Sequence, residues 1–196
     1  MLYIRTRKIM KFIILNFIVV IFLFIFIEGL SSTVMLLKEV AKKETVAESL
    51  YTKYDEQLGW VNIPDVHIKD MYGPGVYLKT NSQGFRNNQD FSTDVPNGKI
   101  RIICSGDSFT LGYGVDNDHT WCQQLVSIDK RLETVNMGQG GYGLDQAYLW
   151  YKRDGVKLEH DIHIFAFITI DYKRMQSNKF LGYSKPDLTL EDAALI

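Results

Sequence analysis

The longest apolar stretch of the chain lies near its N-terminus. Residues 12–27 read FIILNFIVVIFLFIFI, in which Asn16 is the only polar residue. With its flanking apolar positions, this stretch approaches the ~20 residues that a membrane-spanning helix needs. The pattern predicts a membrane anchor over residues 1–33. A cleaved signal peptide is the alternative, because Gly29-Leu30-Ser31 has the small-residue spacing of a cleavage site.

The charges around this stretch indicate an orientation. It is preceded by four basic residues, Arg5, Arg7, Lys8 and Lys11. Positive charge before a span favours a cytoplasmic N-terminus, which predicts an extracytoplasmic C-terminal domain. The asymmetry is reduced by three lysines on the far side, Lys38, Lys42 and Lys43. Residues 34–53 keep a helical pattern and are predicted to form a stalk that continues from the anchor.

Regular periodicity is absent from residues 54–98. Pro64, Gly73-Pro74-Gly75 and Pro96 interrupt this stretch, so it is predicted to consist of short extended pieces joined by turns. It also contains four aromatic residues, Trp60, Tyr72, Tyr77 and Phe85. Their presence favours a segment that packs on the rest of the domain over a free linker.

From residue 99 onward, apolar runs alternate with helical patterns. Strands are predicted at Ile100–Cys104, Thr134–Met137 and Ile162–Ile170, and helices over residues 121–132 and 144–158. The third run, IHIFAFITI, is continuously apolar, as is typical of a strand covered on both faces. Alternating strands and helices predict an α/β domain over residues 99–196, with a parallel sheet of three strands.

Composition narrows the possible partners. A net charge of -1 and a pI near 6.4 offer no basic excess for the phosphates of a nucleic acid. The two cysteines, Cys104 and Cys122, fall in a predicted strand and a predicted helix, which indicates buried thiols and no disulfide framework. The residues suggest no metal site and no cofactor, apart from the less favoured possibility of a bound nucleotide.

Candidate chemistry gathers where the predicted strands end. Ligands of open parallel sheets bind outside the carboxyl ends of the strands, where Ser108, a glycine cluster after Met137, and Asp171 are expected. Gly106 and Asp107 precede the serine, and such a strand-to-helix turn can present a hydroxyl beside free backbone N–H groups. The alternative is that Ser108 merely belongs to a turn or a helix cap.

The glycine cluster allows a second interpretation. Gly138, Gly140 and Gly143 satisfy G-x-G-x-x-G between a strand and a helix, the setting of a dinucleotide site. The acidic residue expected about 20 positions later is missing, because Asp161 precedes the third strand and Asp171 follows it too late. Alternatively, the glycines allow one loop to approach another closely.

Two of these blocks together resemble a known family. GDSFTLG resembles the first block of the SGNH hydrolases, the GDSL-type esterases and lipases, and VNMGQGGYG resembles their glycine block. LGW and TNSQGFR are similar to the segment ahead of the serine in membrane-anchored members, so the likeness spans residues 58–173. It implies a flavodoxin-like fold and hydrolysis or transfer of acyl esters of small molecules, glycans or lipids.

The same resemblance implies roles for individual residues. Ser108 would be the nucleophile, and the backbone N–H groups of Ser108 and Gly141 would stabilise the oxyanion. Asp107 would shape the turn and would not belong to a catalytic triad. The supporting residues would be Gly106, Asp107, Asn136, Gly138 and Asp171.

The chain also departs from the family pattern. Ile170 stands where the third block carries an asparagine that donates to the oxyanion, and losing one such donor costs about 10²–10³ in rate. No Asp-x-x-His follows the third strand, and the four histidines are interpreted as surface or packing residues: His67, His119, His160 and His163. The chain is therefore expected to be the front half of such a domain, poorly active by itself. The alternatives are a non-catalytic binding or scaffold protein with a degenerate fold and, less favoured, a nucleotide-binding domain.

Overall fold

The computed structural model describes residues 2–41, 47–185, 190–191 and 194–195. Contacts between residues divide the chain into two compact units, residues 1–45 and residues 46–196.

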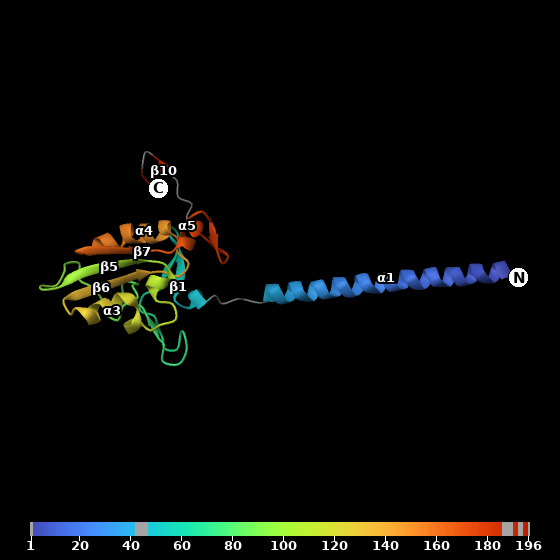
Figure 1. Ribbon diagram of the computed structural model, residues 1–196, viewed down its shortest axis with the longest axis horizontal. Helices are drawn as coiled ribbons and strands as arrows, with labels where there is room; N and C mark the ends of the chain where they lie inside the picture. The colour runs from blue at the N-terminus through green and yellow to red at the C-terminus, as the bar shows by residue number, and fades with distance from the viewer. Residues whose placement is uncertain (1, 42–46, 186–189, 192–193, 196) are drawn as a thin grey trace. The chain divides into compact units, whose positions relative to one another are not determined.

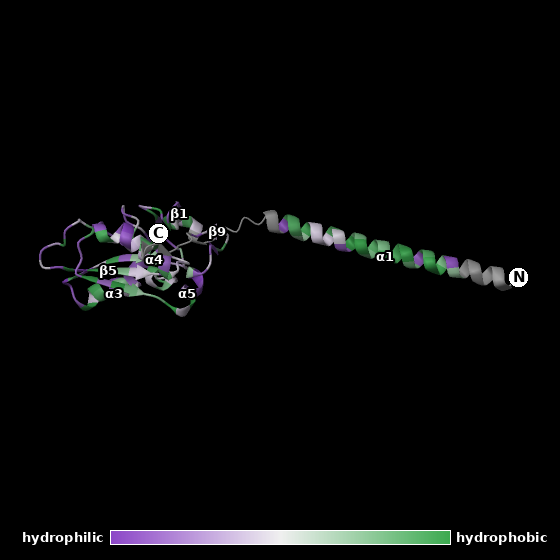
Figure 2. Cartoon of the chain, turned by 90° about the horizontal axis from the view of Figure 1, so that it is seen from above, coloured by the Kyte–Doolittle hydropathy of each residue, from purple (hydrophilic) through white to green (hydrophobic). Residues whose placement is uncertain are grey.

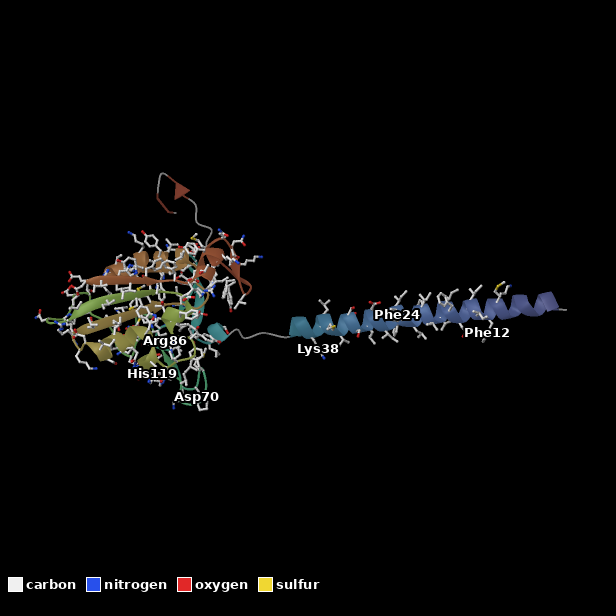
Figure 3. The ribbon with its side chains drawn as sticks, viewed as in Figure 1. Phe12, Phe24, Lys38, Asp70, Arg86 and His119 are labelled. Atoms are coloured by element: carbon white, nitrogen blue, oxygen red, sulfur yellow. The ribbon has the colours of Figure 1, made fainter. Side chains whose placement is uncertain are left out.

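The first unit is the helix α1, Leu2–Ala41 (Figure 1). Its segment Met10–Lys38 contains an 18-residue stretch with a mean hydropathy of 2.9, and the side chains of the segment are exposed. Figure 2 shows its apolar colouring. Phe12 and Phe24 project outward from the helix, each 68% exposed (Figure 3). At 1.5 Å per residue these 29 residues extend about 44 Å, more than the ~30 Å hydrocarbon core of a bilayer. The predicted anchor is thus a helix long and apolar enough to cross a membrane.

The predicted helical stalk is correct only in its first part. Helix α1 continues without a break to Ala41, whereas residues 42–46 lie outside the described residues. A 3₁₀ turn η1, Ala47–Leu50, follows, and Thr52 and Lys53 belong to a strand and not to a helix. Pairing with a second strand overrides the local helical pattern there.

Short antiparallel hairpins make up much of the segment before the main sheet. They are β1 (Thr52–Asp55) with β2 (Gly59–Asn62), and β3 (His67–Ile68) with β4 (Leu78–Lys79). The prediction of extended pieces joined by turns is confirmed. Trp60 and Phe85 are 4% and 3% exposed and belong to the main core, which confirms that the segment packs on the domain.

The main sheet has three parallel strands in the order β6-β5-β7. They are β5 (Ile100–Gly106), β6 (Leu132–Gly138) and β7 (Ile162–Ala166). Gly106 pairs with Gly138 on one side and with Ala166 on the other, so the three strands end at one edge. The predicted α/β class and parallel sheet are confirmed. After β5 the chain forms β6 on one side of it and then crosses to form β7 on the other side. The carboxyl end of β5 is therefore a topological switch point of the sheet.

Helices cover both faces of this sheet (Figure 1). Helix α3 (Trp121–Ile128) packs against Ile102 and Cys104, and helix α4 (Leu144–Arg153) covers Ile103 on the opposite face. This follows from strand geometry, because successive side chains of a strand point to opposite faces. Both cysteines are buried and free, as predicted.

Two predicted helices end earlier than their apolar stripes. Helix α3 stops at Ile128, and Leu132 is the first residue of β6, although its side chain still packs against the α3 cluster. Helix α4 stops at Arg153 and is followed by a 3₁₀ turn η3, Gly155–Lys157. In this helix Trp150 is 3% exposed, whereas Tyr148 is 39% exposed.

The third predicted strand is shorter and less covered than expected. Strand β7 ends at Ala166, and the rest of the apolar run enters helix α5 (Thr169–Met175). Within the described part of the chain, β7 pairs with β5 alone, and Ile162 remains 44% exposed. Two further hairpins follow, β8 (Lys179–Phe180) with β9 (Tyr183–Ser184), and β10 (Leu190–Glu191) with β11 (Ala194–Leu195).

Candidate functional site

Ser108 lies at the carboxyl end of the central strand. It is the first residue of a short helix, α2 (Ser108–Leu111), and it is partly exposed. Asp107 is the N-cap of this helix, and its side chain accepts a hydrogen bond of 2.9 Å from the Phe109 N–H. Asp107 is 2% exposed, so the turn buries its cap and presents the neighbouring hydroxyl. Asp107 thus shapes the turn, and the serine stands at the expected strand-to-helix junction.

Two glycines allow this turn to sit tightly over the sheet. A Cβ on Gly106 would lie 2.3 Å from the Ala166 carbonyl oxygen. A Cβ on Gly138 would lie 1.9 Å from the Leu111 backbone nitrogen, so helix α2 rests directly on the end of β6. The glycines at both strand ends therefore serve close backbone approach, which was one of the two interpretations of the cluster.

Asn136 connects β6 to the serine helix. Its amide nitrogen donates to the Thr110 carbonyl at 2.9 Å, and its amide oxygen accepts from the Gly138 N–H at 2.9 Å. The Asn136 backbone N–H in turn donates to the Asn87 side chain at 2.8 Å. Asn136 is 1% exposed. Asn136 therefore binds the helix α2, which carries Ser108, to the end of strand β6.

Arg86 holds the loop that follows the serine helix, and the sequence offered no role for it. It is 1% exposed, and its Nη1 donates to the carbonyls of Leu111 and Gly112 at 2.6 Å each. Its Nη2 donates to the Val115 carbonyl at 2.5 Å, and its Nε donates to the Asn117 side chain at 3.0 Å. Burial lowers the pKa of Arg86. Figure 3 shows Arg86 within the domain.

A third connection joins the serine turn to helix α5. Arg174 Nη1 lies 3.1 Å from Asp107 Oδ2 and 2.8 Å from Asp171 Oδ1. Asp171 also accepts the Ile168 N–H at 2.9 Å and so caps the first turn of α5. Burial and the neighbouring Asp107 raise the pKa of Asp171, against the lowering effect of the Ile168 N–H and Arg174. Asp171 therefore lies near the serine turn, linked to it through Arg174.

The predicted oxyanion donors are the backbone N–H groups of Ser108 and Gly141. Neither donates a hydrogen bond to any residue of the described chain. Gly141 has φ +74° and is buried, because the ring of Phe180 from β8 lies over it: a Cβ there would be 2.1 Å from that ring. Phe180 itself stacks on Trp60 at 5.9 Å between ring centroids. The β8–β9 hairpin thus covers Gly141, the residue that would supply one of the two donors.

One histidine near the serine loop has a carboxylate partner. His119 ends the 3₁₀ turn η2 (Asn117–His119), and its Nδ1 lies 2.8 and 2.9 Å from the two carboxylate oxygens of Asp116. Although burial acts to raise it, hydrogen bonds from the ring and backbone of His119 keep the pKa of Asp116 below its ordinary value. The order Asp116-Asn117-Asp118-His119 is itself an Asp-x-x-His, a signal that lies before the third strand, where the family pattern does not place it.

In the described chain, the other candidate side chains are not hydrogen-bonded to Ser108. His163 Nε2 lies 2.5 Å from Ser105 Oγ on the α4 face, and its ring stacks on Tyr151 at 3.6 Å. In the part of the chain that the structure describes, no histidine is hydrogen-bonded to Ser108 Oγ, and no group of three or more potential metal ligands occurs. Ile170 lies in α5 and is 42% exposed.

The packing of the glycine cluster bears on nucleotide binding. Gly138, Gly140 and Gly143 are all buried, and a Cβ on Gly143 would lie 2.8 Å from the Met175 backbone nitrogen. The loop is thus filled by the protein itself, which disfavours a cradle for a pyrophosphate. No protein-family model matches the chain, and no curated protein matches it significantly.

Proposed function

We propose that this chain carries an acyl-ester hydrolase or acyl-transferase site of the SGNH type on a flavodoxin-like domain, with Ser108 as the nucleophile. The observation that carries the proposal is the position of Ser108. It is a partly exposed hydroxyl at the switch point of a parallel sheet, on a turn whose other members, Gly106 and Asp107, are buried. Acylated carbohydrates and lipids are the proposed substrate class.

The proposed reaction is attack by Ser108 Oγ on the ester carbonyl. The developing oxyanion would accept hydrogen bonds from the Ser108 and Gly141 N–H groups. As the carbonyl reforms, the alcohol would leave with the proton that a base has taken from the serine, and water or an acceptor hydroxyl would then cleave the ester formed on Ser108. The serine proton needs a base, whose assistance typically contributes about 10²–10⁴-fold. Because no described histidine contacts Ser108 Oγ, the 196-residue chain is expected to turn over short esters hardly above background.

A second candidate is a non-catalytic binding protein that retains the fold. Phe180 over Gly141 is the observation that favours it, because an oxyanion donor must be open to the substrate. Both candidates place a ligand at Ser108, but only the first gives that hydroxyl nucleophilic character.

Covalent labelling with an alkyl fluorophosphonate tests the proposed function. Ser108 Oγ would form a bond to phosphorus while the P–F bond breaks, releasing fluoride and the serine proton. Because no described histidine contacts Ser108 Oγ, this labelling should be slow, and after prolonged exposure peptide mapping by mass spectrometry should find the adduct on Ser108. Ser108→Ala should lose the adduct. Ser127→Ala removes an exposed serine of α3 and should label normally. His119→Ala reports whether the Asp116 pair supplies the base, by a slower labelling rate. No adduct on Ser108 after prolonged exposure would favour the binding protein.

The membrane arrangement is also a proposal. We infer that α1 is a single-pass anchor with the domain outside the cytoplasm, because four basic residues precede the apolar segment. Protease added to intact cells should then digest the domain, and protection of the domain would reverse the orientation. A shortened mature N-terminus would identify a cleaved signal peptide instead.

A further inference from the structure

An apolar pocket opens between Ser108 and Trp121, the first residue of α3. It has a volume of about 340 Å³ and is lined by Ser108, Phe109, Gly112, Tyr113, Val115 and Trp121. This volume lies at the small end of the ~300–1,000 Å³ typical of ligand sites. The proposed nucleophile is therefore part of the wall of a half-open pocket and does not stand on a flat surface.

The lining is almost entirely hydrocarbon and aromatic. Phe109 and Tyr113 are 67% and 58% exposed, so two large aromatic side chains of one pocket are open to solvent. The lining side chains include no carboxylate, amide, guanidinium or ammonium group, and their polar atoms are two hydroxyls and an indole N–H. Contact with water is unfavourable for these rings, and a hydrocarbon ligand would relieve it.

The floor of the pocket is held in place by Arg86. Its guanidinium binds the carbonyls of Gly112 and Val115, two of the lining residues. Tyr113 lies between them, and its ring packs on Tyr72 with 4.8 Å between centroids. The pocket is consequently formed before any ligand arrives, which favours binding because less ordering is required.

We propose that this pocket binds the hydrocarbon chain of the ester, attached within a few bonds of the carbonyl that Ser108 attacks. The inference rests on the proposed function and chooses a lipid-like ester within its substrate class. A sugar would also stack on aromatic rings, but its hydroxyls need several polar partners, and the lining offers too few.

The test is ligand binding to Ser108→Ala, which needs no nucleophile. The full chain, carrying 5-fluorotryptophan, is placed in lipid nanodiscs and followed by ¹⁹F NMR, with Trp121→Phe assigning the pocket signal. A series of 2-alkanones from butanone to decanone serves as the probe, because each carries a carbonyl on a hydrocarbon chain. The Trp121 signal should shift saturably, and the Kd should fall about fourfold per added methylene until the pocket is full.

Matched valine variants locate the binding. Val115→Phe should fill the pocket and weaken decanone binding at least tenfold, whereas Val156→Phe, at an exposed valine on η3, should leave it unchanged. The inference is overturned if the alkanones do not move the Trp121 signal, if Val156→Phe is the variant that weakens binding, or if methyl glucoside shifts Trp121 and decanone does not. Failure of fluorophosphonate labelling together with alkanone binding would refute the nucleophile alone and leave the pocket standing.

Discussion

The two flanks of Ser108 are built in contrasting ways. On the β6 flank, Arg86 and Asn136 are about 1% exposed and donate to main-chain carbonyls of the serine helix and its following loop. On the β7 flank, Arg174 bridges two aspartates, and its side chain is 19% exposed. Around it, Ile170 is 42% exposed. The β6 flank is a buried network of hydrogen bonds to backbone carbonyls, and the β7 flank is an ion network that is partly exposed to solvent.

This contrast indicates which flank determines the position of the nucleophile. A buried carbonyl that loses its donor costs about 1–3 kcal/mol, because water cannot easily replace the partner. An ion pair that water can reach is screened and contributes less. The β6 flank should therefore fix where Ser108 lies, and the β7 flank should mainly adjust the charge around it.

The largest expected effect comes from Arg86→Met. The methionine fills part of the space but leaves the carbonyls of Leu111, Gly112 and Val115 without their donor. We expect the free energy of unfolding to fall by about 3 kcal/mol or more. Urea unfolding of the full chain in nanodiscs, followed by tryptophan fluorescence, measures it.

Arg131→Met is the matched control for this substitution. Arg131 is 70% exposed and pairs with Asp129 two residues away, so its removal should leave the unfolding curve unchanged. Arg86→Lys should fall between wild type and Arg86→Met, because an ammonium group cannot reproduce the fork of guanidinium donors. Equal stability of the two Arg86 variants and wild type would contradict the assignment of the β6 flank as the rigid one.

The two flanks also differ in how accurately the sequence predicts their strands. The strands β5 and β6 were predicted within two residues at each end, because buried apolar runs carry a strong signal. The end of β7 was missed because the apolar run continues past it into α5. The start of that helix is marked by Asp171, which accepts the Ile168 N–H, and a cap supplied from inside the helix is easily mistaken for an ordinary acidic residue.

The sequence also predicts only part of the candidate site. Ser108, Asp107 and the glycines are neighbours in sequence or follow strand ends, so local rules place them together. Arg86 binds carbonyls 25 to 29 residues further along the chain, and main-chain acceptors have no sequence identity to search for. The position of Phe180 over Gly141 depends on a hairpin that no local pattern aligns with the glycine loop.

A moderate effect is expected from Arg174→Met on the β7 flank. Asp107 and Asp171 would both lose their cation, and we expect a loss of about 1–2 kcal/mol at pH 7. The pKa of Asp171 is already raised by burial, so its protonated form favours the folded state below the ordinary value of 3.8, and this contribution is lost as pH rises. Without Arg174 the pKa of Asp171 in the folded state should rise further, so more stability should be lost as pH rises. The difference between variant and wild type in urea unfolding should therefore shrink from pH 7 to pH 4, and a difference that is constant with pH would contradict the ionic role.

The smallest expected effect concerns His163 at the exposed edge of the sheet. Burial and the nearby His160 lower the pKa of His163 from its ordinary value of 6.5, so the unfolded chain binds the proton more readily than the folded one. Its contribution to stability is complete above pH 6.5 and is lost as pH falls through the lowered pKa. The free energy of unfolding of wild type should therefore decrease between pH 7.5 and pH 5.5. His163→Gln can keep a hydrogen bond to Ser105 but does not titrate, so its decrease over the same range should be shallower. The difference in unfolding free energy between wild type and His163→Gln should be smaller than the effect of Arg86→Met or Arg174→Met, because the His163 ring is partly open to water. Identical slopes for the two proteins, measured by urea unfolding at five pH values, would show that this edge responds to acid no more than the buried β6 flank does.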